Sequence, residues 1–151
     1  MKEVSTEIRK GVLTALGSLE IDGVVIPIFD SQVPTQAVIP TYKGGESYIV
    51  LKDQQEVETT DNKCTFRQNA SITLDVITKF PKGSGGNLNA ETISKAIQYI
   101  IQPFNGIGIS AGSDFQILRT TKSASQSLRE ETPTQSVYRK IIIYTFDTFE
   151  K

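Results

Sequence analysis

The sequence predicts an α+β fold with a small, mostly antiparallel sheet, two helices packed on one face, and long polar hairpin arms or loops. Three observations predict it: a long run of alternating apolar and polar residues, an amphipathic helix after that run, and an apolar final strand. The alternating run places one set of apolar residues on a single strand face: Cys64, Phe66, Ala70, Ile72, Leu74, Val76 and Phe80. The sheet face and the helix stripe each need an apolar partner, and each is the simplest partner for the other.

The first third of the chain predicts one helix and several short extended segments. Residues 3–19 form a helical pattern because Ile8, Val12 and Leu16 share one face. The Asp22-Gly23 pair then indicates a tight turn between two apolar runs. Residues 48–51 are wholly apolar and predict a short strand.

Two long polar segments join the predicted strands. Residues 52–63 connect the short strand to the long alternating one, and residues 120–136 separate the last two strands. Each segment is either a loop or the extension of its flanking strands into a hairpin arm. Polar connections of this length on a compact domain are more often functional or mobile than idle.

The second half of the chain supplies the second helix and two further strands. Residues 90–102 carry an apolar stripe with helical spacing, and Asn89 is the predicted N-cap. Residues 115–119 predict a strand, and residues 137–149 predict the last one. The last strand is apolar on both faces around Ile142, so it should be central or covered on both sides.

Length and composition limit the function. The 151 residues predict one domain, 1–151, and the formal net charge of −1 creates no global attraction for nucleic acid or an anionic membrane. The chain has no histidine and one cysteine, which excludes Cys/His zinc sites and Ser-His-Asp or Cys-His catalysis. No apolar run approaches the roughly 20 residues of a membrane span. We therefore expect no enzyme, no catalytic residue, no cofactor, no metal and no membrane contact.

The polar residues are the remaining candidates for function. One face of the long strand carries a polar ladder that would face a channel or a neighbouring subunit: Arg67, Asn69, Ser71, Thr73, Asp75 and Lys79. Charged residues in and beside the 120–136 segment are predicted inter-subunit contacts, by exposure and charge only: Arg119, Lys122, Arg129, Glu130 and Glu131. Long strands with polar arms and no active site are typical of subunits that assemble, often into rings. The alternative is a nucleic-acid or small-ligand binding module that uses the polar sheet face.

The order of the predicted elements resembles that of the tail-terminator, or tail-completion, proteins of tailed bacteriophages. A helix precedes a proline-containing extended segment, a short strand, the long strand 66–76 and the helix 90–102. Two strands separated by a polar segment follow, and the last carries Arg139 among aromatic residues. The resemblance covers most of the chain and consists of this order and of the polar-apolar texture of the long strand.

This resemblance implies a structural virion protein that joins the tail or neck to the head connector. Its subunits would form a homo-oligomeric ring, commonly a hexamer, that caps the tail tube and contacts head-connector or portal-side proteins. DNA would pass through the ring without sequence-specific binding. The protein would be assembled in the host cytoplasm and reside in the virion.

Overall fold

A computed structural model describes residues 2–62, 65–104, 106 and 108–151 of the chain. It contains two helices and eight strands in these residues, and the fold is α+β. The helices are α1 (Ser5–Leu16) and α2 (Leu88–Ile101). The strands are β1 (Glu20–Ile21), β2 (Val24–Val25), β3 (Ile28–Asp30), β4 (Thr41–Tyr42), β5 (Gly45–Asn62), β6 (Thr65–Pro81), β7 (Phe115–Glu131) and β8 (Gln135–Glu150).

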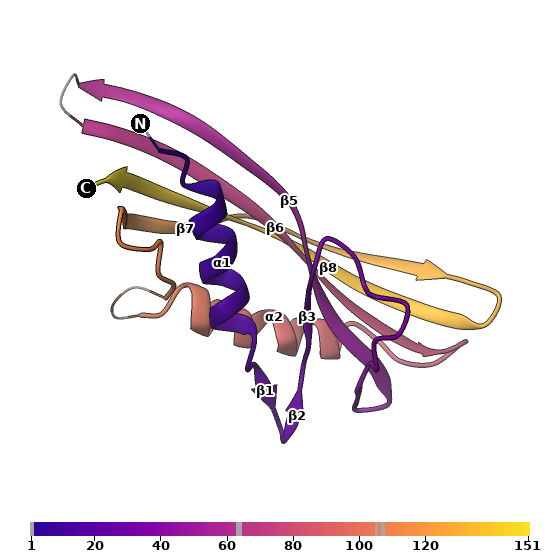
Figure 1. The fold of residues 1–151 in the computed structure, drawn as a ribbon. Helices are drawn as coiled ribbons and strands as arrows, with labels where there is room; N and C mark the ends of the chain where they lie inside the picture. The colour runs from indigo at the N-terminus through magenta and orange to yellow at the C-terminus, as the bar shows by residue number, and fades with distance from the viewer. Residues whose placement is uncertain (1, 63–64, 105, 107) are drawn as a thin grey trace.

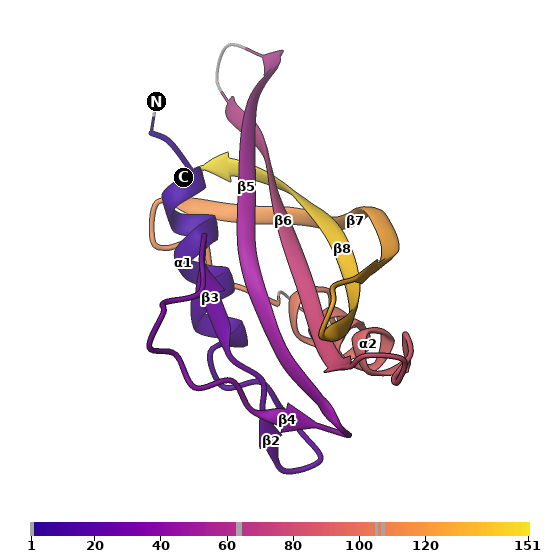
Figure 2. The same ribbon diagram turned by 90° about the vertical axis from the view of Figure 1, so that its right-hand side faces the viewer.

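Four long strands and the short strands β3 and β4 make the main sheet of six strands. Its order is β3-β5-β6-β8-β7, with β4 paired to β5, and every pair is antiparallel except β3 with β5. The last strand, β8, lies between β6 and β7, as its two apolar faces predict. Figures 1 and 2 show the four strands as one long, strongly twisted sheet.

Both helices pack on the same face of this sheet. The apolar stripe of α1, including Ile8, Val12 and Leu16, joins the stripe of α2, including Ile93 and Ile97, in one buried cluster. The predicted apolar face of β6 contributes the sheet side of that cluster, with Ala70, Ile72, Leu74 and Val76 all fully buried. Sheet and helices therefore cover each other as predicted, whereas Cys64 and the side chain of Phe66 lie outside the part that the structure describes.

The two polar segments are hairpin arms. Strand β5 continues through residues 52–62, and β7 continues to Glu131, so neither segment is a loop. The last rung that joins β6 to β8 is Arg67–Phe149, and the described residues beyond it pair only between β5 and β6. In Figure 1 the β5–β6 and β7–β8 hairpins end at opposite ends of the sheet.

The segment before β5 covers a small part of the other sheet face. Asp22 and Gly23 adopt positive φ angles of 51° and 82° and form the predicted turn between β1 and β2. Further on, Phe29, Val33 and Ile39 pack on a second apolar cluster made of Tyr48, Val50, Ile77 and Val137. This cover reaches only the end of the sheet where β5 begins.

The start of α2 differs from the prediction. The N-cap position is Asn87, without a side-chain capping bond, and Asn89 lies within the first turn. Asn89 is buried, and its side-chain amide donates a hydrogen bond of 2.8 Å to the backbone oxygen of Tyr42. The residue therefore ties α2 to β4 instead of capping the helix, because a tertiary acceptor lies within its reach.

Candidate functional site

The candidate site is the sheet face opposite the helices, which we call the outer face. Because side chains alternate along a strand, the burial of Ala70, Ile72, Leu74 and Val76 sends the predicted polar ladder of β6 to the outer face. The ladder residue Asn69 is exposed, and Arg67, Ser71, Thr73 and Lys79 are partly exposed. The second apolar cluster covers part of this face, and no helix of the described chain packs on it.

Asp75 departs from the rest of the ladder because its side chain is fully buried. The amine of Lys52 lies 2.7 Å from its carboxylate, and the guanidinium of Arg139 makes a second, bidentate contact. Glu130 accepts a further bond of 2.7 Å from Arg139. The hydrogen bonds with Asp75, followed by those with Glu130, raise the pKa of Arg139 above its usual value. These four side chains connect the strands β5, β6, β8 and β7 to one another. Asp75 was predicted to face a channel or a neighbouring subunit, but its carboxylate binds cations of its own subunit.

Other charges on the outer face are also neutralised locally. Arg67 pairs with Asp147 of β8, and the amine of Lys79 lies 5.5 Å from the centre of the Tyr48 ring. Between these groups Ile141 and Ile143 are only half-buried. The outer face is therefore a mixed surface, in which cations next to carboxylates surround a weakly apolar centre.

Four of the five predicted contact residues of the second arm bind other side chains of the same chain, and the fifth is Arg119. Arg129 and Glu131 form an ion pair within β7, which lowers the pKa of Glu131, and Glu130 binds Arg139. Lys122 donates a hydrogen bond of 3.1 Å to the side chain of Gln98 on α2. Arg119 is exposed.

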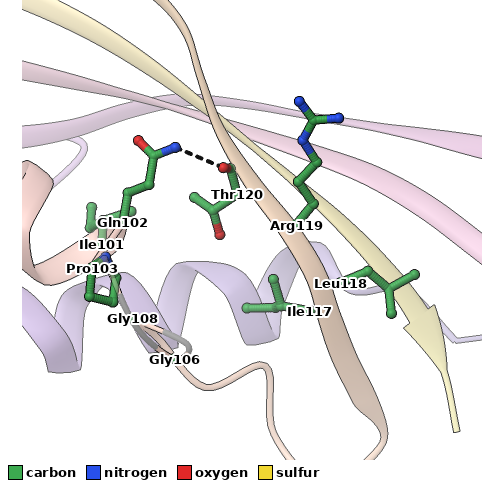
Figure 3. Close-up of a pocket in the computed structure, with 9 residues that line it drawn as sticks. All are labelled: Ile101, Gln102, Pro103, Gly106, Gly108, Ile117, Leu118, Arg119 and Thr120. Atoms are coloured by element: carbon green, nitrogen blue, oxygen red, sulfur yellow. Dashed lines mark hydrogen bonds between the residues drawn. The ribbon is translucent and has the colours of Figure 1, made fainter.

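A shallow pocket, which no sequence pattern indicates, lies between the end of α2 and β7 (Figure 3). It encloses about 260 Å³ and is lined by Ile101, Gln102, Pro103, Gly106, Gly108, Ile117, Leu118, Arg119 and Thr120. Gln102 donates a hydrogen bond of 2.9 Å to the backbone oxygen of Thr120, and Arg119 points away from the pocket. Its lining has one charged side chain and no acid-base pair, so it offers no means of general acid-base catalysis.

The described chain has no constellation suited to metal chemistry. No group of three or more metal-ligating side chains in residues 2–62, 65–104, 106 and 108–151 could hold an ion. None of the helices formed by these residues is long and apolar enough to cross a lipid bilayer.

The sequence matches no family model and has no significant match among curated proteins.

Proposed function

We propose that this protein is a structural virion subunit of the tail-terminator or tail-completion class, which forms a ring between a phage tail and the head connector. One observation carries the proposal: in the described residues the helices pack on one face of the sheet, and the opposite, polar face continues onto two hairpin arms. A monomer gains little from such arms, because their side chains are polar and bury little apolar surface. Subunits that contact neighbours and a channel do gain from them.

The placement of the arms favours a ring over a two-fold dimer. The β5–β6 and β7–β8 hairpins lie at opposite ends of the sheet and differ in sequence (Figure 1). Contacts between two different surfaces of the same subunit are heterologous, and they close into a ring when the rotation between copies fits. A hexamer is the ring size that the resemblance of the sequence implies.

The charges on the outer face suit a channel through which DNA passes. Arg67, Arg139 and Lys52 each have a carboxylate partner, so little positive potential remains to hold phosphates. A mixed face of this kind binds the DNA phosphates only weakly, so the DNA can move past it. The same pairing weighs against the alternative of a nucleic-acid binding module, which needs unpaired cations beside exposed aromatic residues.

The state of association tests the proposal. We expect mass photometry and light scattering of the purified protein to show one closed oligomer, and negative-stain microscopy to show annular particles with a central channel. Added to isolated tail tubes, the labelled protein should bind at one end. A protein that stays monomeric at high concentration, even with tail tubes present, would contradict the proposal. Salt-dependent binding of oligonucleotides by that monomer would favour the alternative.

A further inference from the structure

Two long strand edges face outward at opposite sides of the sheet. Strand β7 pairs with β8 alone among the described strands, so its other edge has no partner strand, although the side chain of Gln102 binds the backbone oxygen of Thr120. Strand β5 pairs with β3 only at residues 49–51 and with β4 only at residues 45–46, so its outer edge has no partner strand in residues 53–59. An open edge presents unpaired backbone donors and acceptors and can accept a further strand.

The regular parts of the two open edges lie at the same level of the sheet. Register shifts interrupt β7 beside residues 118 and 123, and β5 between Leu51 and Gln54. Between these shifts, four consecutive rungs cross all four long strands. The first rung runs from Gln54 to Lys122, and the last runs from Val57 to Arg119.

A second copy placed beside the first would continue the sheet in the antiparallel sense. Strands β5, β6, β8 and β7 alternate in direction, so β7 runs opposite to β5. A neighbour related by rotation about an axis along the strands brings its β5 next to this β7 with the directions still opposed. Antiparallel pairs form regular hydrogen-bonded ladders, so the backbone geometry favours this contact.

The charges of the two edges are complementary at that level. Residues 117–122 of β7 contain Arg119 and Lys122 and no acidic residue. Residues 53–59 of β5 contain Asp53, Glu56 and Glu58 and no basic residue. Because a strand rises about 3.4 Å per residue, the Cα atom of each cation would lie within roughly 7 Å of the Cα atom of an acid on the neighbour. Glu56 and Glu58 lie on the face that the helices cover and Arg119 lies on the other face, so Arg119 faces these acids across the edge and does not pair with them within one rung. Separations of this order are comparable with the Debye length of about 8 Å at physiological ionic strength, so the opposite charges of the two edges attract each other.

Exposed apolar groups lie beside the β7 edge. Tyr99 is 72% exposed and Phe104 is 99% exposed, and both line a surface hollow next to Gln102. Gln102 in turn binds the backbone of Thr120, in the middle of the open edge. Leu118 adds a half-exposed side chain in the same part of β7. Aromatic anchors of this kind dominate the energy of protein interfaces, and they extend the contact beyond four rungs.

We propose that neighbouring copies of this chain join by antiparallel pairing of residues 119–122 of β7 with residues 54–57 of β5 in the next copy. Arg119 and Lys122 select the acidic edge, and Tyr99 and Phe104 cover the junction from the side of α2. The contact is heterologous, so its repetition generates a ring. This inference rests on the proposed ring, and it names the surfaces that form it.

Charge reversal tests the contact. The basic-edge variant carries Arg119→Glu and Lys122→Glu, and the acidic-edge variant carries Asp53→Lys and Glu58→Lys; Glu56 is left intact because it accepts a bond from the backbone amide of Ser5. We expect each double variant to weaken subunit association at least tenfold in mass photometry. An equimolar mixture of the two variants should associate again, because each then offers the other a complementary edge. The variant with all four substitutions should assemble alone.

A matched control reverses two exposed lysines outside both paired stretches, Lys10→Glu on α1 and Lys82→Glu after β6. It changes the net charge as much as the basic-edge variant does, and we expect association within threefold of the wild type. If a reversal variant fails to fold by circular dichroism, hydrogen exchange of the wild type replaces it: assembly should protect amides in residues 119–122 and 54–57. A wild type that assembles while the edge variants or these amides are unaffected overturns the edge contact and leaves the ring. A wild type that never assembles overturns both.

Discussion

Replacement of Tyr144 by phenylalanine should stabilise this protein. The Tyr144 side chain is fully buried in the main core, where β8 faces the helices. Its hydroxyl is also buried, and no group of the described residues forms a hydrogen bond with it. A buried hydroxyl without a partner has lost its bonds to water and gained none, which costs about 1–3 kcal/mol. Tyr144→Phe removes that oxygen and keeps the ring that fills the core.

The expected gain depends on pH in a defined way. We expect about 1 kcal/mol at pH 7, the lower end of the range, because a small void remains where the oxygen was. Burial raises the pKa of Tyr144 from 10.0 to about 12, so the folded state holds the phenolic proton more tightly than the unfolded state does. The stabilisation from this shift is complete below pH 10 and is lost as the pH rises towards 12. At pH 11 the wild type has lost roughly 1.4 kcal/mol of this stabilisation, and the variant, which has no hydroxyl at this position, loses none.

Urea denaturation at pH 7 and pH 11, at one fixed protein concentration, measures both effects. The difference in unfolding free energy should favour Tyr144→Phe at both values and grow with pH. Tyr42→Phe is the control, since the Tyr42 hydroxyl donates a bond of 3.1 Å to Asp22 and its loss should cost about 1 kcal/mol. If Tyr144→Phe were less stable than the wild type, or if the difference were flat between the two pH values, the reasoning would be refuted.

Two other substitutions probe the packing of the subunit, each measured by urea denaturation. Asp75→Asn should cost about 3 kcal/mol, because it leaves the Arg139 guanidinium half-paired beneath the outer face; a loss below 1 kcal/mol would show that the buried ion pair is dispensable. Gly11→Ala should cost about 1–3 kcal/mol, because a methyl group there would overlap the backbone oxygen of Ser110. Gly86→Ala is its control, since nothing lies within 4 Å of a methyl group at that position and the change should stay within about 0.5 kcal/mol.

The sequence is sufficient to predict the elements that bury apolar surface. The alternation of Ala70, Ile72, Leu74 and Val76 fixes which face of β6 meets the core, and all four residues are buried. The helical spacing of Ile93 and Ile97 similarly predicts the buried face of α2. Burial of apolar side chains leaves a periodic pattern in the sequence, and for this reason these parts of the fold can be predicted.

The arms could not be assigned from sequence because their order does not come from apolar burial. Residues 120–131 of β7 contain only Ala124 and Leu128 as apolar residues, so no period is present to distinguish strand from loop. The ladder between β7 and β8 holds them instead, and backbone hydrogen bonds require no particular pattern of side chains. The burial of Asp75 could not be predicted for a related reason. Its two cationic partners, Lys52 and Arg139, are distant in the sequence, and a buried carboxylate has the same position in the alternation as an exposed one.

The same absence of apolar burial bears on function. A hairpin that buries no core is only marginally stable by itself, and an open edge is a liability that proteins normally blunt. In this chain both open edges contain regular stretches at one level, with cations on one edge and acids on the other. If these edges merely faced solvent, mixed charges or prolines would protect each of them equally well. Segregated charge also lets each edge accept the other and reject itself, since pairing β7 with β7 would bring like charges together. The charge pattern thus favours the proposed head-to-tail contact over a two-fold contact through either edge.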